Sequence, residues 1–354
     1  MKIGFLVDKV SFGGGERLLK MLIDDFYKLH HKIILYTWNK DWLRICCPEY
    51  DIRVMENPPV RFWGKWKALF SLRDNLNCTK PDCLIVFSLG LAEVAVWAAL
   101  WAKIPIILSE RVDPHFLPQS KFHRFFKKIV YKNCSGIVFQ TQVVKSFFSK
   151  SIQQKSIVIP NPILDDNLPI IADSICKKEV VTVGRLSTEK NFEMLVYAFA
   201  EAKLTGYKLR IFGEGPLYSS LSSLITSLDM CDSIILEGKV DRVIDYIQHS
   251  DIFVMTSNHE GMPNALIEGM AMGLACVSTD FPSGAARVLI SDNKNGIIIP
   301  VNDRLALKEA LQKLVSDQSF KQHIKSNAIK IRETNSKDII LPKWIDFIQS
   351  VVYK

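Results

Sequence analysis

The chain has 354 residues, 48% of them hydrophobic, and a formal net charge of +8. This length accommodates two domains with full cores, and this composition excludes an intrinsically disordered chain. The charge is uneven, because residues 1–165 hold 24 Lys and Arg against 14 Asp and Glu, whereas residues 166–354 hold 21 against 23. A basic first half favours a domain that faces an anionic partner, such as a membrane surface or a phosphorylated acceptor.

The cysteines and the apolar segments indicate the cellular compartment in which the protein works. The eight cysteines show no Cys-x-x-Cys spacing, and several lie in apolar strings, which favours reduced, buried thiols over a disulfide framework. The first residues turn polar too quickly for a signal peptide. Residues 84–109 are apolar, but Glu93, Lys103 and Pro105 interrupt them, so we predict strand, helix and strand there instead of a membrane span. We therefore expect a cytoplasmic protein.

The first half reads as alternating strands, loops and helices. An apolar run at residues 3–7 precedes residues 11–17 (Ser-Phe-Gly-Gly-Gly-Glu-Arg), and apolar positions at helical spacing follow over 18–29. Glycines between a strand and a helix let a ligand approach the backbone, which makes Gly14 and Gly15 candidate binding residues. The loop is not the Gly-x-Gly-x-x-Gly dinucleotide fingerprint. Further strands are predicted at 32–37, 106–108, 136–141 and 157–159.

Two segments of the first half mix cations with large aromatic residues, at 61–70 and at 116–131. Basic, aromatic-rich amphipathic segments dock on anionic bilayers through charge attraction and shallow apolar burial. An ordinary surface helix with an apolar core face explains the same pattern. Nothing else in the chain supports nucleic acid binding, so we expect no nucleic acid partner.

Two further features close the first half. The strand at 106–108 runs into a polar loop with Arg111 and His115, and in a doubly wound sheet such loops line the crevice, although a plain turn with an ion pair accounts for the same residues. The strand at 157–159 ends at Pro-Asn-Pro, and the polar stretch that follows has little periodicity. We therefore place the domain boundary near residue 168, which gives domains 1–168 and 169–354.

The second half restarts the same rhythm. A strand at 179–183 ends at Gly184, and the following loop holds Arg185 and Lys190 before a helix at 192–202. Arginine offers a fixed fork to phosphate oxygens and lysine a mobile point charge. The next strand ends in a turn with two glycines, which permit positive φ and a close approach of the backbone to its neighbours. The strand after it, at 234–238, ends in a further loop. The residues concerned are Gly213, Gly215, Lys239 and Val240.

A buried strand at 252–255 leads to a loop and a helix that carry two carboxylates eight residues apart, Glu260 and Glu268. Pro263 suits the first turn of a helix, where a missing N–H costs nothing, and free N–H groups at such an end attract phosphate. Carboxylates suit hydroxyl-rich ligands, so the combination predicts a nucleotide-sugar site. A helix cap beside an exposed Glu is the simpler alternative.

The fourteen residues from Glu260 to Gly273 resemble the Glu-x7-Glu signature of family-four retaining glycosyltransferases with the GT-B architecture. Residues 13–17, 184–191, 213–216 and 279–284 are similar to further motifs of that family, with an extra glycine in the first and Arg287 where polysaccharide-assembly members often have Glu. The resemblance covers nearly the whole chain. It implies an α/β fold of two Rossmann-like, doubly wound parallel-sheet domains facing a cleft, with the terminal helical segment crossing back onto the first domain.

This resemblance implies a first domain that binds the acceptor and a second that binds the nucleotide sugar. Arg185 and Lys190 would hold the donor diphosphate, Glu260 would orient the sugar, and Glu268 would bind the ribose hydroxyls. Arg111, or else His115, would approach the donor sugar or the acceptor. The implied catalytic residues are Glu260, Arg185, Lys190 and Arg111. The implied donor-binding residues are Gly14, Gly15, Gly184, Arg185, Lys190, Gly213, Gly215, Lys239, Val240, Glu260, Gly261, Met262, Pro263, Asn264 and Glu268.

We therefore expect a retaining transferase that moves a sugar from a nucleotide diphosphate donor, a UDP-hexose or UDP-N-acetylhexosamine, to a glycan acceptor. The acceptor would be polyprenyl-diphosphate-linked, as in O-antigen or capsule assembly, and the enzyme peripheral on the inner face of the cytoplasmic membrane. No Asp-x-Asp site is present and cationic side chains can replace a metal, so we expect no metal and no cofactor besides the donor.

Other functions fit parts of the sequence. A GT-B-like sugar-nucleotide epimerase would accept the donor without an acceptor, and a phosphorylase would need a pyridoxal-phosphate lysine and usually a longer chain. A non-catalytic, membrane-associated sugar-nucleotide binding protein would tolerate loss of Glu260, Arg185 or Lys190, yet all three are present. A membrane scaffold would bind vesicles but show no donor-dependent chemistry.

Overall fold

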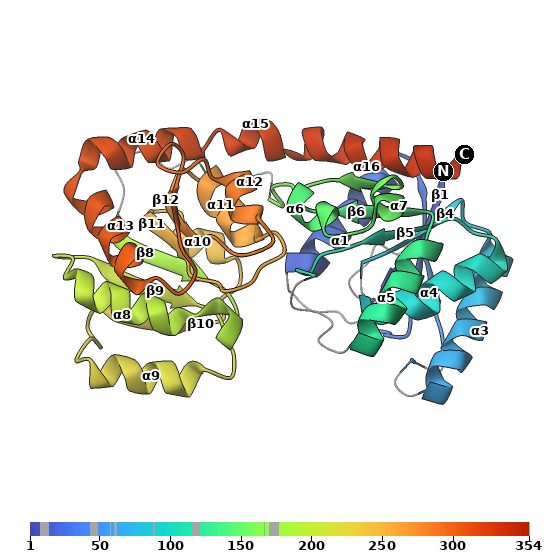
Figure 1. Cartoon of the computed structure of the whole chain (residues 1–354), viewed down its shortest axis with the longest axis horizontal. Helices are drawn as coiled ribbons and strands as arrows, with labels where there is room; N and C mark the ends of the chain where they lie inside the picture. Colours follow the sequence, from blue (N-terminus) through green and yellow to red (C-terminus); the bar gives the residue numbers. More distant parts are fainter. Residues whose placement is uncertain are drawn as a thin grey trace. The chain divides into compact units, whose positions relative to one another are not determined.

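The computed structural model describes residues 1–7, 14–42, 49–56, 58–59, 62–87, 89–114, 121–165, 167–169 and 177–353, without the side chains of 14, 62, 89 and 121–126. The chain divides into two compact units (Figure 1). Unit 1 comprises Met1–Asn161 and Ile340–Lys354, and unit 2 comprises Pro162–Ile339. The division falls inside the Pro-Asn-Pro sequence, a few residues before position 168, and the last segment of the chain belongs to unit 1.

Unit 1 is built on a seven-stranded, fully parallel sheet in the order β3-β2-β1-β4-β5-β6-β7. Parallel neighbours need long crossovers, which the helices between the strands supply. The strands are β1 (Lys2–Val7), β2 (Lys32–Thr37), β3 (Asp51–Val54), β4 (Cys83–Val86), β5 (Ile106–Ser109), β6 (Gly136–Phe139) and β7 (Ser156–Val158). The helices are α1 (Gly14–Lys28), α3 (Phe62–Thr79), α4 (Leu89–Ala102), α5 (Lys121–Asn133), α6 (Gln142–Ser146), α7 (Lys150–Gln153) and α16 (Lys337–Val352).

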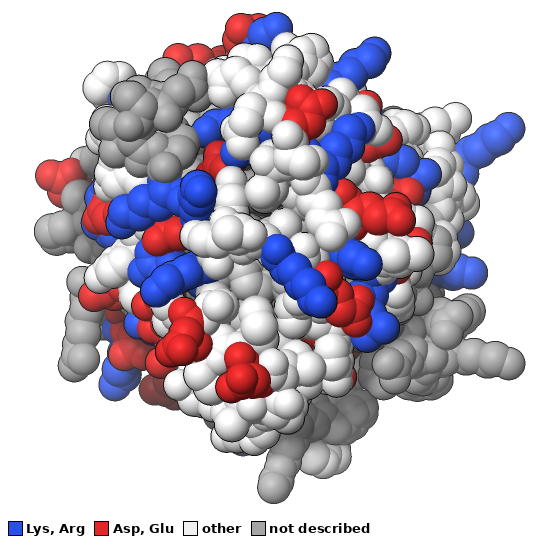
Figure 2. Space-filling model, turned by 90° about the vertical axis from the view of Figure 1, so that its left-hand side faces the viewer, with Lys and Arg blue, Asp and Glu red and all other residues white. Residues whose placement is uncertain are grey.

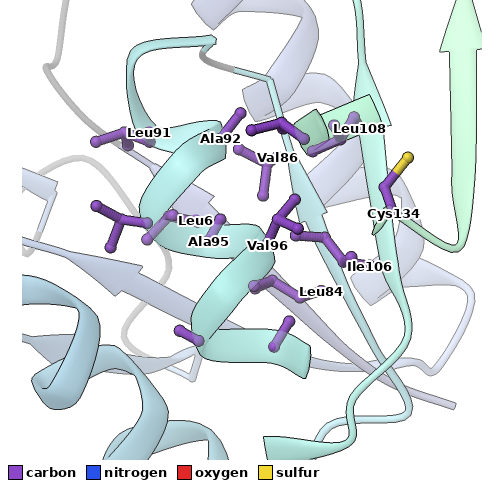
Figure 3. Close-up of a cluster of buried hydrophobic side chains, with 14 of the residues drawn as sticks. Leu6, Leu84, Val86, Leu91, Ala92, Ala95, Val96, Ile106, Leu108 and Cys134 are labelled. Atoms are coloured by element: carbon purple, nitrogen blue, oxygen red, sulfur yellow. The ribbon is translucent and has the colours of Figure 1, made fainter. Parts of the chain in front are cut away.

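The segment at 84–109 folds as predicted, into β4, α4 and β5. Small residues of α4, Ala92 and Ala95, let the helix lie close to the sheet, where it meets Leu84 and Val86 (Figure 3). This cluster is the core of one face of the unit 1 sheet. Among the described residues, no helix is both long enough and apolar enough to cross a membrane.

The start of α1 differs from the prediction. Gly14 and Gly15, which were expected in a loop before a helix at 18–29, form the first turn of α1. Hydrophobic spacing reveals only the part of a helix that faces the core, and glycines contribute no side chain to that pattern. The preceding residues 11–13 lie outside the described part of the chain.

Unit 2 is built on a six-stranded parallel sheet in the order β10-β9-β8-β11-β12-β13. The strands are β8 (Lys177–Val183), β9 (Lys208–Phe212), β10 (Ile234–Gly238), β11 (Ser250–Met255), β12 (Ala275–Thr279) and β13 (Ile297–Ile299). The helices are η2 (Thr188–Lys190), α8 (Phe192–Ala202), α9 (Tyr218–Ser227), α10 (Val243–Ile247), α11 (Asn264–Ala271), α12 (Ala285–Leu289), α13 (Arg304–Ser316), α14 (Gln318–Ala328) and α15 (Ile331–Asn335). Two doubly wound parallel sheets confirm the predicted fold class.

The surface charges agree with the near-neutral second half of the sequence. Figure 2 shows Lys and Arg intermixed with Asp and Glu on the face seen from the left of Figure 1. Charges of both signs so interspersed create no long-range field of one sign over that face.

Candidate active site

Two loops at the carboxyl edge of the unit 2 sheet are joined to each other. The strands β8 and β11 are neighbours, so the loops at 184–191 and 256–263 leave the same edge. The backbone N–H of Asn258 donates to the carbonyl oxygen of Glu189 at 2.8 Å, and the hydroxyl of Thr256 donates to the carbonyl oxygen of Lys190 at 2.8 Å. In open α/β sheets this edge, outside the strand ends, is where ligands bind.

The same two loops bring together a cation and a carboxylate. The ammonium group of Lys190 donates to Oε1 of Glu260, and the hydroxyl of Ser257 donates to the same oxygen at 2.8 Å. The two charged side chains are only 19% and 15% exposed, so solvent screens their interaction less than on an open surface. Glu260 is thus fixed from two sides, and Lys190 lies beside it, at a sheet edge suited to a phosphorylated, hydroxyl-rich ligand.

Glycines allow a third loop to pack directly against the first. Gly213 has φ +141°, and a Cβ there would lie 1.9 Å from the carbonyl oxygen of Gly184. A Cβ at Gly215 would lie 2.3 Å from the carbonyl oxygen of Leu186. Only glycine can occupy either position at this spacing, so the loop after β9 completes a layer of backbone at the sheet edge.

The start of α11 follows the Glu260 loop. Pro263 has an extended backbone (φ −81°, ψ 113°) and caps the helix, which begins at Asn264, so the proline directly precedes the first turn in which it was expected. A proline at the boundary leaves the next N–H groups at the helix N-terminus, where they favour anionic oxygens. Glu268 and Asn264 lie one helical turn apart on α11 and are both buried, while Met262 packs into the apolar core.

Strand β12 and the loop that follows it support the Glu260 loop from its other side. The Thr279 hydroxyl donates to the carbonyl oxygen of Ser257 at 2.6 Å, and the Ser283 hydroxyl donates to the carbonyl oxygen of Gly261 at 3.0 Å. The sequence reasoning did not single out these supporting roles, or that of Ser257. The available signal was a hydroxyl residue at or shortly after the end of a buried strand, from where it reaches the neighbouring loop.

The remaining predicted residues of unit 2 lie along the same edge. Arg185 is exposed in the loop after β8. The N–H of Gly213 donates to the carbonyl oxygen of Gly238 at 2.8 Å, which places Lys239 and Val240 beside the glycine turn. The structure therefore gathers the predicted residues of this unit at the ends of four neighbouring strands, β8, β9, β10 and β11.

Among the predicted residues of unit 1, Arg111 has partners within that unit. Arg111 follows β5, donates to Oδ1 of Asn161 at 2.6 Å, and places its guanidinium 4.8 Å from the ring of Phe87 and 5.7 Å from that of Trp344. Burial lowers the pKa of Arg111 to about 9. Its alternative, His115, lies outside the described residues. Arg111 thus lies against a stacked pair of aromatic rings and is hydrogen-bonded to Asn161, all within unit 1.

Among the described residues, no group of three or more His, Cys, Asp and Glu side chains is placed to hold a metal ion.

Residues 175–331 match the family model of glycosyl transferases group 1. The match contains all the site residues of unit 2 described above. The second unit therefore carries the match to this family of glycosyltransferases, and the two parallel-sheet units have the GT-B fold.

Known proteins resemble the chain over nearly its full length. It is 26% identical to the Campylobacter jejuni GalNAc-alpha-(1->4)-GalNAc-alpha-(1->3)-diNAcBac-PP-undecaprenol alpha-1,4-N-acetyl-D-galactosaminyltransferase, over 99% of each chain. It is 23% identical to the amylovoran biosynthesis glycosyltransferase AmsD of Erwinia amylovora, over 98% of this chain and 99% of that protein. The crystal structure of Anabaena HepE in complex with UDP and glucose superposes with a TM-score of 0.85 at 17% identity, over 99% of this chain and 100% of that one, a similarity of fold.

Proposed function

We propose that the chain transfers a hexose or N-acetylhexosamine from a UDP-sugar to a glycan acceptor with retention at the anomeric carbon, in bacterial surface polysaccharide assembly. The observation that carries this proposal is the contact of Lys190 with Glu260 at the carboxyl edge of the unit 2 sheet, beside the glycine turn. The names of two similar proteins support it, since one acts on an undecaprenol-PP-linked glycan and the other binds UDP and glucose.

In this proposal the two cations of the β8 loop act on the leaving group. When the bond from the anomeric carbon to the diphosphate breaks, negative charge builds on the diphosphate oxygens. Arg185 is exposed in the loop and Lys190 is held at Glu260, so both are available at that edge to stabilise the charge. Two cationic side chains supply the charge that a divalent metal supplies elsewhere, and we infer that transfer needs no metal.

The two carboxylates would bind different parts of the donor. Glu260 is fixed by Lys190 and Ser257, and a carboxylate so oriented can accept hydrogen bonds from sugar hydroxyls and steady positive charge at the anomeric carbon. Glu268 lies inside α11, where it would accept hydrogen bonds from the ribose hydroxyls. The N-terminus of α11, from Met262 to Asn264, would hold donor oxygens.

The acceptor would bind unit 1. The basic first half of the sequence suits an acceptor that carries a diphosphate, and we propose a polyprenyl-diphosphate-linked glycan. An acceptor of this kind is anchored in a bilayer, so the enzyme would work as a peripheral protein at the inner face of the cytoplasmic membrane. Arg111 of unit 1 is the residue that the family resemblance places near the donor sugar or the acceptor, and Gly14 and Gly15 of the same unit are assigned to donor binding.

Donor binding is tested by thermal shift of the pure chain with UDP-, GDP-, ADP- and dTDP-sugars, with and without EDTA. A donor at a hundred times its Kd should stabilise the protein by about 2.7 kcal/mol. We expect a UDP-sugar to give the shift, EDTA to leave it unchanged, and Glu268→Gln to reduce it by raising the Kd. The exposed Glu193→Gln on α8 is the control for loss of a carboxylate. No shift with any donor would contradict the proposal, and a shift abolished by EDTA would contradict metal independence.

Turnover separates the roles of the two carboxylates. Glu260→Gln should keep the thermal shift with UDP but lower transfer to a polyprenyl-diphosphate-linked glycan by about 100-fold or more, because its interaction strengthens in the transition state. Conversion of the donor to its epimer without any acceptor would favour an epimerase instead. Analysis of the product by NMR reports whether the anomeric configuration is retained.

A further inference from the structure

Three helices of unit 1 form one layer on the sheet. Helix α4 packs against α3 on one side and against α5 on the other (Figure 1). The inner faces of α3 and α4 supply apolar side chains to the core that Figure 3 shows in part. The outer face of this layer is a separate surface, and its residues differ from those of an ordinary solvated helix face.

The outer faces of α3 and α4 carry large aromatic side chains. Trp63 is 77% exposed and Trp101 is 48% exposed. Further exposed apolar residues of these two helices are Trp66, Phe70, Trp97 and Leu100. Spacings of three and four residues align them as one stripe along each helix, and the rings of Phe70 and Trp101, 5.8 Å apart, join the two stripes. Contiguous exposed apolar surface of this kind marks an interaction site.

Cations flank this aromatic surface. Helix α5 (Lys-Phe-His-Arg-Phe-Phe-Lys-Lys-Ile-Val-Tyr-Lys-Asn) has five Lys and Arg and no Asp or Glu, and its Lys128 and Lys132 are exposed. Lys67 is exposed among the tryptophans of α3. Lys65 is instead paired with Glu93 at 2.7 Å, which neutralises one charge within the patch and joins α3 to α4. The result is an apolar stripe beside a basic, acid-free helix.

We propose that the outer face of α3 and α4, flanked by the cations of α5, is the surface by which unit 1 docks on an anionic lipid bilayer. Tryptophan side chains prefer the headgroup level of a bilayer, because the apolar part of the ring can contact lipid there while the indole N–H remains hydrated. Lysines beside that level attract anionic headgroups. A second copy of the chain docked on this face would bring its own α5 cations against the α5 cations of the first copy. This repulsion disfavours a dimer through this face.

Docking through this surface would hold the enzyme at the membrane in which the proposed lipid-linked acceptor is anchored. The existence of that acceptor rests on the proposed function. The binding is shallow and reversible, because aromatic side chains reach only into the interface and no helix inserts. Attraction by α5 makes the binding depend on salt, since the Debye length falls from about 10 Å at 0.1 M to about 3 Å at 1 M. The aromatic contribution persists at high salt.

The test is co-sedimentation of the full chain, without donor, with vesicles of phosphatidylglycerol and phosphatidylcholine or of phosphatidylcholine alone. We expect binding to the anionic vesicles that weakens at 1 M salt, with a blue shift of tryptophan fluorescence. Trp63→Ser and Trp101→Ser should each weaken it about tenfold, the effect of losing roughly 60 Å² of buried apolar surface. Phe147→Ser, an exposed aromatic residue outside the patch, is the matched control and should bind as the parent does.

Lysine variants test the electrostatic part. Lys128→Gln and Lys132→Gln should each weaken binding to the anionic vesicles about fivefold. Lys208→Gln and Lys294→Gln, two exposed lysines of unit 2, change the net charge equally and should have no such effect. If all four variants bound alike, attraction would come from net charge and not from α5.

Three results would overturn the proposal: no binding of the parent chain to anionic vesicles, undiminished binding of the tryptophan variants, or a dimer of the parent that the tryptophan variants convert to monomers. All substituted side chains are exposed, so the variants should melt with the parent and keep its thermal shift with UDP. A chain that binds vesicles without any shift from a sugar nucleotide would contradict the proposed function and leave the docking surface standing.

Discussion

Gly213 shows how one residue sets the geometry of the site. Its φ of +141° and the 1.9 Å that would separate a Cβ from the carbonyl oxygen of Gly184 leave no room for a side chain. We expect Gly213→Ala to lower the free energy of unfolding by about 3 kcal/mol or more, because backbone must shift on both sides. Urea unfolding measures the loss.

Gly238→Ala is the matched control for Gly213→Ala. Gly238 also has positive φ, +71°, but a Cβ there meets no described atom within 4 Å. Gly238→Ala should therefore lower the free energy of unfolding only by the strain of a positive φ at alanine, about 1 kcal/mol. Equal losses in the two variants would show that φ alone, and not the close approach of the two loops, requires glycine.

Glu110 gives unit 1 a predictable dependence on pH. Its buried carboxylate contacts the Tyr131 hydroxyl and lies 2.9 Å from the ammonium group of Lys127, and burial raises its pKa above the ordinary value of 4.5. The folded chain thus keeps a proton at pH values where the unfolded chain has released it. Stability contributed by this group therefore falls as pH rises from 4.5 through the raised pKa.

Glu110→Gln should remove that fall. The free energy of unfolding of the variant, measured in urea at a series of pH values, should depend less steeply on pH than that of the parent. The comparison uses the slopes of the free energy of unfolding against pH and not the free energies themselves, because Gln also leaves Lys127 without its carboxylate partner. Glu309→Gln, at an exposed position of α13, controls for the lost charge. Parallel curves for parent and Glu110→Gln would refute the assignment.

The individual site residues were predictable where a local pattern carries the chemistry. Glu260, Lys190 and Gly213 stand out because each lies in a short loop between a strand and a helix. Their contacts were not predictable, since Lys190 and Glu260 are far apart in the sequence and meet only because β8 pairs with β11. The stacking of Arg111 on Trp344 joins residues still further apart and carries no sequence signal.

At the level of elements, burial decided what could be predicted. Strand β4 and the segment Ile252–Met255 of β11 are buried and read as continuous apolar runs, as expected of parallel strands covered on both faces. Strand β3 (Asp-Ile-Arg-Val) lies at the sheet edge, half-buried, and its charged residues conceal it. Polar elements of this kind are defined by their neighbours in the sheet and not by their own pattern.

Helix α14 is joined to β11 by a buried charge cluster. Oδ2 of Asp251 lies 2.5 Å from the ammonium group of Lys321 and accepts from the Tyr207 hydroxyl at 2.6 Å, and Oδ1 lies 3.5 Å from the ammonium group of Lys325. All four side chains are buried. We expect Asp251→Asn to lower the free energy of unfolding by about 3–5 kcal/mol, because two buried ammonium groups lose their counter-charge. Urea unfolding monitored by circular dichroism gives the value.

Glu201→Gln is the control for the charge cluster. Glu201 pairs with Arg304 at 3.4 Å on the surface of unit 2, with both side chains about half exposed. Solvent screens such a pair, so its loss should cost no more than about 1 kcal/mol. If Asp251→Asn cost as little, the lysines of α14 would have reached water, and the cluster would not hold the helix to the sheet.

For the whole molecule, the alternation of strands and helices predicted two doubly wound sheets, and this is confirmed. The sequence alone does not reveal that unit 1 is assembled from two stretches of chain far apart, Met1–Asn161 and Ile340–Lys354. The family resemblance suggested the return of the terminal helix. In the structure, a Cβ at Gly136 of β6 would lie 2.9 Å from Phe347 and Val351, so α16 packs almost onto the sheet backbone.

The last segment should therefore stabilise unit 1 and not unit 2. Trp344 of α16 is 1% exposed and stacks on Phe87 at 5.8 Å, with the guanidinium of Arg111 against both rings. We expect Trp344→Ala to lower the free energy of unfolding of unit 1 by about 3–5 kcal/mol through lost contacts and a cavity. Tyr353→Ala, at a 74% exposed aromatic residue near the end of the same helix, should change it by less than about 0.5 kcal/mol.

Calorimetry can separate the two units, because a chain with two domains need not unfold in one step. Gly213→Ala marks the transition of unit 2, since Gly213 and Gly184 both belong to that unit. Trp344→Ala should then lower the midpoint of the other transition only. If both variants shifted the same transition, the two units would unfold together, and the terminal segment would stabilise the whole chain instead of completing unit 1.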